Sequence, residues 1–576
     1  MRRIVFPESI FNKVRKHLLK DKREQFGFLL AGVCKGENLT LLVREFIPAQ
    51  DNDLEIQSPG LVRSKKAFVK RILRYCYDEG FSLIDVHSHP FSSNQVNFSG
   101  IDDRSERESF RYTMSKIPHI HHASMVFGEN SFRARIWDKR EETMKNVEEV
   151  KVIGSYIKVF PFERERLSFE EDRFSRQILA FGEEGQRRLK RTQVAVVGVG
   201  GIGSLICQML SRLGVGKILL VDMDVVERSN LNRLVGSFEE DIGKPKVKVL
   251  ERWIRNLGID VESVPYSVQE KKVWEKIKEV DVIFGCTDNQ VSRFILNELS
   301  VKYFIPYIDL GVGIESEGGK IKTAGGQVKM VLPDGPCLFC MDGINLTLLN
   351  QELKSEEERE MDIRAGYISG EDIPDPAVIS LNSTIASLGV NEFLNLLCGF
   401  KETEFYLYYD LIKSSVKPIK VRRNHECVTC GERALWGKGD LVSFPLEMVY
   451  EREEEKMDIQ VISEELRTQG FNVRGSKKYN WLEIDLYLGT CWSKDKSKVL
   501  VKFENGGMAV FISEEVELKE GMEELKEIAD DEPFLPGWRR LNIDFQNEDL
   551  IPNLIMLQGI LANPRFLLSL KRSEDG

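Results

Sequence analysis

The stretch from residue 194 to residue 233 constrains the fold more than any other part of the sequence. It starts with a valine-rich run typical of a buried strand, and a segment with the helical spacing of apolar residues follows. A second apolar run, residues 217–221, ends in Asp222. The order strand, glycine turn, helix and strand predicts a nucleotide-binding unit, because backbone amides in such a turn and the start of a helix attract phosphate. The glycines of the turn are Gly198, Gly200, Gly201 and Gly203.

The polar residues around this unit favour ATP over a dinucleotide. Asp222 is placed to accept hydrogen bonds from ribose hydroxyls. Arg233 and Lys246 can neutralise a triphosphate, and Asp288 can hold Mg²⁺, which usually binds through carboxylates and substrate phosphates. A dinucleotide site does not need these additional groups. The predicted nucleotide-binding residues are Gly200, Gly201, Gly203, Asp222, Asp224, Asn230, Arg233, Lys246 and Asp288.

The order of these motifs over residues 170–435 carries a resemblance to a known superfamily. Together with Arg-Phe-Ser-Arg-Gln at residues 173–177, they resemble the ubiquitin-activating enzymes, in particular the ThiF/MoeB-like adenylyltransferases. The resemblance implies a Rossmann-like, doubly wound α/β adenylation domain that uses ATP and Mg²⁺. It also implies a homodimer in which Arg176 reaches the ATP site of the other subunit, with Arg233 as a second catalytic residue. The alternative for Arg176 is a helix-surface arginine.

Two Cys-x-x-Cys pairs predict a structural zinc site. Each pair can bind one edge of a metal ion, and together they supply tetrahedral thiolate ligation. A redox role needs only one pair and fits the pattern less well. His425 is a weaker alternative ligand. The predicted ligands are Cys337, Cys340, Cys427 and Cys430.

A second metal site is predicted in the first 140 residues. His87 and His89 alternate along an extended segment, so both imidazoles project to the same face. Asp102 would be the third ligand, which leaves one position for water, as a hydrolytic zinc site requires. Glu24 is the candidate general base. The alternative is a pair of structural histidines at the end of a strand.

This pattern resembles the JAMM (JAB/MPN+) metalloproteases, which cut ubiquitin-like proteins or trim their C-termini. The shared features are a Glu ahead of a glycine-containing strand, His-x-His, and Ser-x-x-Asp starting at Ser99. The resemblance implies a cytidine-deaminase-like fold, zinc on His87, His89 and Asp102, water activation by Glu24, and oxyanion stabilisation by Ser99. The nine residues between His89 and Ser99 exceed the seven usual in the family.

The remaining segments carry fewer signals. Residues 141–169 are rich in charged residues and are predicted to be a linker, with one possible strand at 150–159. Residues 440–576 are predicted to form an α+β domain of unknown fold and role, with strands at 481–488 and 498–503 and a hairpin turn at Gly506–Gly507.

Composition narrows the class of protein further. The net charge of −10 over 576 residues argues against a nucleic-acid binder, and no apolar run is long enough for a membrane span. Of ten cysteines, four lie in the two Cys-x-x-Cys pairs, so no disulfide scaffold is expected. The expected location is the cytoplasm of a bacterial cell.

These interpretations combine into a bifunctional enzyme that acts on a ubiquitin-like protein with a C-terminal glycine tail. The first domain would hydrolyse a peptide or isopeptide bond at the tail, and the central domain would adenylate the exposed carboxylate. A sulfur donor or a conjugating enzyme would then act in a prokaryotic sulfur-transfer or conjugation pathway. Two alternatives stay open: processing and activation of a sulfur carrier in cofactor or cysteine biosynthesis, and a non-catalytic scaffold. No cysteine lies in residues 341–397, where thioester-forming members have one, so activation is expected to stop at the acyl-adenylate.

Overall fold

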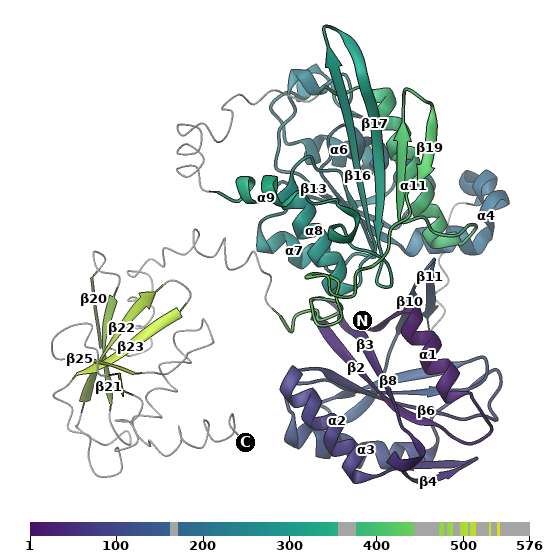
Figure 1. Ribbon diagram of the computed structural model, residues 1–576, viewed down its shortest axis with the longest axis vertical. Coiled ribbons are helices and arrows are strands. Elements are labelled where there is room, and N and C mark those ends of the chain that lie inside the picture. Colours follow the sequence, from purple (N-terminus) through teal and green to yellow (C-terminus); the bar gives the residue numbers. More distant parts are fainter. Residues whose placement is uncertain are drawn as a thin grey trace. The chain divides into compact units, whose positions relative to one another are not determined.

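The computed structural model describes residues 1–161, 171–354 and 376–442, and six strands between residues 472 and 541 (Figure 1). The chain divides into two compact units, Met1–Ser443 and Phe444–Gly576. Within the described ranges, no helix combines the length and the apolar character needed to cross a membrane. The architecture of the first unit is α/β, with two large sheets and helices packed on them.

The first sheet is built from the N-terminal 161 residues. Its elements are β1 (Arg2–Pro7), α1 (Glu8–Leu18), β2 (Phe26–Lys35), β3 (Leu39–Pro48), β4 (Leu54–Ser58), β5 (Leu61–Ser64), α2 (Lys66–Glu79), β6 (Ser82–Ser88), α3 (Gly100–Lys116), β7 (His122–Phe127), β8 (Phe132–Asp138), β9 (Thr143–Asn146), β10 (Glu149–Ile153) and β11 (Ile157–Pro161). The strand order is β11-β10-β1-β3-β2-β6-β7-β8-β9, and β4 and β5 form a separate hairpin. Helix α2 packs Phe68 and Ile72 against Phe28 and Leu30 of β2, because its apolar residues recur on one face.

The predicted linker, residues 141–169, is not a simple linker. Its described part forms β9, β10 and β11, which complete both ends of the first sheet. Val150 and Val152 of β10 are fully buried and pair in parallel with Ile4 and Phe6 of β1. One strand was predicted at 150–159; the chain turns within that range, so that β10 and β11 pair with each other as two antiparallel strands, and β9 was not predicted.

The second sheet forms the central domain. Its elements are α4 (Glu171–Arg191), β12 (Gln193–Val197), α5 (Gly201–Leu213), β13 (Lys217–Val221), α6 (Lys246–Arg255), β14 (Asp260–Val264), α7 (Lys271–Ile277), β15 (Val282–Gly285), α8 (Gln290–Tyr303), β16 (Tyr307–Glu317), β17 (Lys320–Val331), α9 (Leu346–Glu352), α11 (Ile379–Cys398), β18 (Tyr406–Asp410) and β19 (Ser415–Pro418). The strand order is β14-β13-β12-β15-β16-β17-β18-β19. Strands β12 to β16 run parallel, whereas β17, β18 and β19 are antiparallel. This is the predicted Rossmann-like arrangement, extended by antiparallel strands.

Close backbone packing fixes the turn after β12. Gly198 has a φ of +82°, and a Cβ there would lie 2.7 Å from the carbonyl oxygen of Cys286. A Cβ on Gly203 would lie 2.0 Å from the carbonyl oxygen of Gly198. Only glycine therefore lets β12 turn into α5 while the turn stays beside the end of β15.

A short segment near the end of the first unit, residues 432–441, joins the two sheets; we call it the clasp. On the side of the central domain, the Gly437 and Gly439 amides donate to the carbonyls of Val301 (3.0 Å) and Lys302 (2.9 Å). A Cβ on Gly439 would lie 2.1 Å from the carbonyl oxygen of Val33 in β2, so the backbones meet directly. The clasp thus contacts α8 and β2 at once.

Asp440 makes the polar contacts of the clasp. Its amide donates to the Val33 carbonyl (2.7 Å), and its Oδ2 accepts the Lys35 amide (2.6 Å). Its Oδ1 accepts the Tyr303 hydroxyl (2.7 Å) and lies 3.7 Å from Lys278 Nζ. One carboxylate therefore ties β2 to the end of α8.

We predict that Asp440→Ala loosens the contact between the clasp and β2. The substitution removes the charged acceptor of the Lys35 amide and of the Tyr303 hydroxyl, and a hydrogen bond to a charged group contributes about 1.5–3 kcal/mol. Hydrogen exchange at Val33–Lys35 should accelerate about tenfold or more, since 1.4 kcal/mol corresponds to tenfold.

The matched control is Asp334→Ala. Asp334 accepts the Ser9 amide (2.8 Å) at another contact between the two sheets' domains, away from β2. Its removal should leave exchange at Val33–Lys35 unchanged. Equal protection of that segment in wild type and Asp440→Ala would contradict the role assigned to the clasp.

In the second unit, the described residues form a six-stranded antiparallel sheet (Figure 1). Its strands are β20 (Asn472–Ser476), β21 (Trp481–Tyr487), β22 (Lys496–Glu504), β23 (Gly507–Ser513), β24 (Ala529–Asp530) and β25 (Trp538–Leu541), in the order β20-β21-β22-β23-β25-β24. The predicted strands at 481–488 and 498–503 agree with β21 and β22, and β22 pairs with β23 as a hairpin. Much of the predicted C-terminal domain lies outside the described residues.

Candidate functional site

The glycine turn lies at the carboxyl edge of the second sheet, between β12 and α5. Asp222, at the end of β13, holds this turn: its Oδ2 accepts the Val199 amide (2.8 Å) and its Oδ1 accepts the Asp224 amide (2.8 Å). Burial raises the pKa of Asp222. The carboxylate has further lone pairs, so the predicted contact with ribose hydroxyls remains compatible with its structural role.

Arg233 lies beside the glycine turn. A Cβ on Gly201 would be 3.3 Å from Arg233 Cδ. The guanidinium donates to the Ser229 carbonyl (2.6 Å) and to Asn232 Oδ1 (3.2 Å), and it forms no ion pair with a carboxylate in the part of the chain that the structure describes. An uncompensated guanidinium next to a helix N-terminus is suited to phosphate.

Asp224 and Asn230 lie in the loop after β13, and Lys246 is the first residue of α6. Lys246 Nζ donates to Asp224 Oδ2 (2.8 Å), and its amide donates to the Asp224 carbonyl. Asp224 therefore orients Lys246, which is a more specific role than the sequence suggested. Asn230 Oδ1 accepts the Glu227 amide (3.1 Å), which fixes the start of the loop that carries Arg233.

Asp288 follows β15 at the same sheet edge, because the carboxyl ends of β12, β13 and β15 lie together in a parallel sheet. Its side chain is exposed, and the adjacent Asn289 caps α8 by accepting the Ser292 amide (2.8 Å). The structure therefore brings the glycine turn, Asp222 and Asp288 to one edge. Carboxylates placed there are suited to Mg²⁺ carried by a nucleotide.

Two groups at this edge were not predicted. Asn382 of α11 is 2% exposed; its Nδ2 would lie 2.4 Å from a Cβ on Gly201, and its Oδ1 has no hydrogen-bond partner among the described residues. The sequence feature that could have revealed it is an asparagine within the otherwise apolar run of α11. The second group is Asp309, fully buried, which accepts the Tyr307 hydroxyl (2.8 Å) and lies 3.4 Å from Arg293 Nε. Asp309 lies within an apolar strand, so its position at this edge becomes apparent only from the pairing of β15 with β16.

Arg176 is not brought to this site within the single chain. It lies on the exposed face of α4, and no described hydrogen bond or ion pair joins it to the glycine turn, Arg233 or Asp288. Nearby, Gln177 Nε2 donates to the carbonyl of Leu213 (3.0 Å), which fixes α4 against the end of α5. Both interpretations of Arg176, surface arginine and a group for a second copy, remain compatible with this position.

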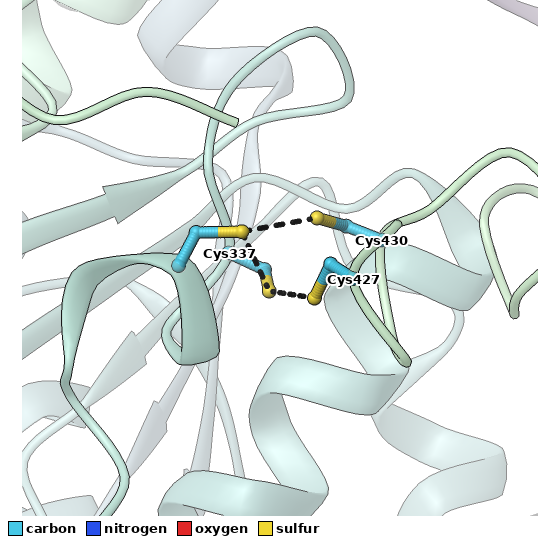
Figure 2. A group of neighbouring side chains, drawn as sticks. Cys337, Cys427 and Cys430 are labelled. Carbon is cyan, nitrogen blue, oxygen red and sulfur yellow. Dashed lines mark hydrogen bonds between the residues drawn. The ribbon is translucent and has the colours of Figure 1, made fainter. Parts of the chain in front are cut away.

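The four cysteines of the two Cys-x-x-Cys pairs converge (Figure 2). The Sγ distances are 3.9 Å for Cys337–Cys340, 3.6 Å for Cys337–Cys427 and 3.5 Å for Cys340–Cys430. A tetrahedron with Zn–S bonds of about 2.3 Å has S–S edges of about 3.8 Å. The donor set and its spacing thus fit zinc, as predicted from the sequence, and the predicted alternative His425 is 74% exposed on its side chain.

Helix α8 supports both cysteine loops. Asn297 Oδ1 accepts the Leu338 amide (2.7 Å) between the first two cysteines. Glu298 Oε1 accepts the Thr429 hydroxyl (2.8 Å) between the other two. Burial raises the pKa of Glu298 to about 7.

Comparisons with known proteins agree with this geometry. The pattern of the ThiF family matches residues 174–429. The SAMP-activating enzyme E1 of Haloferax volcanii is 32% identical over 271 residues, which cover 45% of this chain and 89% of that protein. This chain belongs to the ThiF family. The sulfur carrier protein adenylyltransferase of Thermus thermophilus is 30% identical and covers 46% of this chain and 92% of its own length.

Solved structures of Escherichia coli MccB are more distant. One is 22% identical, covers 48% of this chain and 76% of that chain, and superposes with a TM-score of 0.38. A likeness at this level carries no argument about chemistry. The ThiF assignment rests on the family match and on the sequence relatives, and the family match falls on the central domain with its glycine turn and Rossmann-like sheet.

A second cluster lies ahead of the ThiF region. His87 is in β6, His89 follows that strand, and Asp102 is in the first turn of α3. Asp102 Oδ1 lies 3.4 Å from His87 Nε2, and its Oδ2 lies 3.5 Å from His89 Nε2. Zinc bonded to N and O at about 2.0–2.1 Å gives ligand–ligand edges of about 3.4 Å.

Other features of this cluster also fit a metal. His87 is 8% exposed, and its Nε2 forms no hydrogen bond with any described residue. Glu24 Oε1 lies 3.9 Å from His89 Nε2, at the position expected for a base. The Gln25 amide donates to Ser88 Oγ (3.0 Å), which fixes the chain beside Glu24. Burial raises the pKa of Glu24 to about 7.

Ser99 has a role that the sequence did not suggest. It is the N-cap of α3: its Oγ accepts the Asp102 amide (3.2 Å), and its own amide donates to Asp102 Oδ2 (2.6 Å). This reciprocal cap orients the carboxylate toward the histidines. Its hydroxyl proton can still donate, so the predicted oxyanion contact stays a prediction.

We predict that the purified chain binds about two zinc ions, one at each cluster, because four thiolates complete a tetrahedron and the three ligands of the histidine cluster leave one position for water. Cys430→Ser should lose one ion, and His89→Ala should lose the other. Elemental analysis after dialysis gives the metal-to-protein ratio.

Cys398→Ser and His119→Ala are the controls, because neither residue belongs to a cluster. Both variants should keep the wild-type ratio. A wild-type ratio near one that only Cys430→Ser lowers would exclude zinc at the histidine cluster.

Proposed function

We propose that this chain is a two-site enzyme that acts on the C-terminal tail of a ubiquitin-like or sulfur-carrier protein. The central domain, residues 170–435, would adenylate the tail, and the N-terminal domain would hydrolyse a bond at the same tail. The observation that carries the first activity is the glycine turn beside Arg233, which pairs with no carboxylate of the described residues, in a chain of the ThiF family. The names of the relatives, which activate SAMP and sulfur carrier proteins, support the substrate class.

The adenylation step follows from the groups at the sheet edge. A carboxylate oxygen of the tail attacks the α-phosphorus of ATP. The bond between this phosphorus and the oxygen that bridges the α- and β-phosphates breaks, and pyrophosphate leaves. Arg233 and Lys246 would stabilise the charge that develops on the phosphates, and Asp288 would hold Mg²⁺. Arg176, exposed on α4, would serve the site of a second copy in a homodimer.

We expect exchange of pyrophosphate into ATP that depends on the cognate small protein. Arg233→Ala should lower the exchange rate by about 10²-fold or more, because preorganised charge at developing anions contributes that much. Asp288→Ala should lower it similarly through loss of Mg²⁺.

Arg228→Ala is the matched control: Arg228 lies in the same loop but pairs with Glu239 on the surface (2.9 Å). It should retain wild-type exchange. Pyrophosphate exchange that does not need the small protein, or whose rate is unchanged in Arg233→Ala, would contradict the adenylation proposal.

The N-terminal activity is carried by the His87, His89 and Asp102 cluster with Glu24 beside it. Zinc, when bound there, would lower the pKa of a coordinated water. Glu24 would accept the proton of the attacking water and pass it to the leaving amine as the peptide or isopeptide bond breaks. The products are the tail carboxylate, which the central domain can use, and a free amine.

We predict that Glu24→Gln abolishes cleavage of a precursor of the cognate protein and retains zinc, because the amide cannot accept the proton but leaves the three ligands intact. Mass spectrometry of the tail measures cleavage, and elemental analysis measures zinc.

Glu55→Gln is the control, because Glu55 is an exposed carboxylate of β4 that does not belong to the histidine cluster. It should cleave like wild type. Cleavage of the precursor by Glu24→Gln at the wild-type rate would remove Glu24 from the mechanism.

The acyl-adenylate would then pass to an external nucleophile. Cys398 is half-buried, and burial raises the pKa of its thiol, so it is a poor internal acceptor. A sulfide donor would give a thiocarboxylate, and a lysine would give a conjugate. Both outcomes suit a chain that first exposes a tail carboxylate and then activates it.

A further inference from the structure

The ligands of the histidine cluster come from two separate elements. His87 and His89 are held by β6 and its pairing with β7, in which the His89 amide donates to the Phe127 carbonyl (2.8 Å). Asp102 is carried by α3, and the Ser99 cap orients it only relative to its own helix. The metal geometry therefore depends on what fixes the start of α3 over the sheet.

Arg135 of β8 makes that connection. Its Nε donates to Glu106 Oε2 (2.8 Å), and its NH1 donates to Asp103 Oδ1 (2.6 Å). Asp103 follows Asp102 directly, and Glu106 lies one helical turn further, so the guanidinium holds the first turn of α3 at two points. Arg135 is 9% exposed and Glu106 is 7% exposed, so solvent does not screen their pair as it does a surface ion pair.

The same guanidinium also fixes the chain ahead of α3. Arg135 Cζ lies 3.7 Å from the ring centroid of Phe98, the residue before Ser99. The Phe98 ring in turn lies 6.2 Å from the His87 ring. Arg135 therefore contacts the residues on both sides of the Ser99–Asp102 cap, and through Phe98 it reaches the histidine side of the cluster.

We propose that Arg135, acting through Glu106, Asp103 and Phe98, is the positioning residue that sets Asp102 against His87 and His89. The inference rests on the proposed metal-hydrolase function of this cluster, but it concerns metal binding rather than turnover. A planar guanidinium can serve the carboxylate pair and the ring at once. Lysine, a single point donor, cannot reproduce this arrangement.

The test is the zinc affinity of the full-length chain, measured by titration with a chromogenic chelator. The chelator removes zinc from the two sites in two steps, and the step that belongs to the histidine cluster is the one that His89→Ala abolishes. Arg135→Lys should weaken zinc at that step by about 10-fold, the lower end of the range for residues that support metal ligands, because Arg135 acts on Asp102 only through its neighbours. The step that belongs to the four cysteines should not change.

Arg111→Lys is the matched control, because Arg111 also joins α3 to a carboxylate, but in an exposed pair with Glu142 (2.8 Å). It should keep wild-type affinity. Phe98→Leu removes the stacked ring and leaves the ion pairs, and it should weaken the same step by a smaller factor. This second variant keeps the proposal testable if Arg135→Lys does not fold.

Outcomes distinguish this proposal from the hydrolase proposal. A lower melting temperature of Arg135→Lys with zinc affinity within twofold of wild type would overturn the positioning role. Unchanged zinc affinity in Phe98→Leu would overturn the role assigned to the Phe98 ring. Weakened zinc in Arg135→Lys, in a chain whose wild type cleaves no precursor, would support positioning and contradict the hydrolase function alone.

Discussion

The hydrogen bond from the Val199 amide to the Asp222 carboxylate is the contact on which the nucleotide edge depends. It fastens the glycine turn to the end of β13, and the close contact of Gly198 with Cys286 fastens the same turn to the end of β15. Three parallel strands thereby share one fixed edge. This edge holds Arg233, Asp288 and the N-terminus of α5 in place, so they can act together on one nucleotide. The ThiF match falls on the region that builds this edge.

Local patterns predicted the groups whose chemistry limits what they can bind. The glycine turn and its flanking strands can be recognised within residues 194–222. The spacing of each Cys-x-x-Cys pair indicates that both of its thiolates can bind one metal ion. His87, His89 and Asp102 were also predicted together, and the structure brings their ligand atoms within 4.8 Å of one another. In each case the chemistry of the donors limited the possible partners, so sequence distance did not matter.

Groups with no such chemical signature were missed. Strand β9 was missed, as was the turn that divides the predicted strand at 150–159 into β10 and β11, because β10 takes its place in the sheet from β1, almost 150 residues earlier in the chain. Asn382 and Arg135 look like ordinary polar residues of a helix and a strand. Their roles come from packing against the glycine turn and the start of α3, which only the tertiary structure supplies. Asp222 and Ser99 were recognised, but their backbone contacts were not.

The clasp also has a consequence for the order of folding during synthesis. Lys35 and Asp440 are separated by 405 residues, and ribosomes add about 5–20 residues per second. The last strand of the N-terminal sheet ends at Pro161, about 280 residues before Asp440, so all strands of this sheet exist for roughly 14–56 s before the segment that joins it to α8 has been made. It must fold with the backbone groups of β2 still open to water, and the two domains can lock together only after both are complete. A contact made by one late carboxylate thus makes domain docking one of the last steps in the maturation of the first unit.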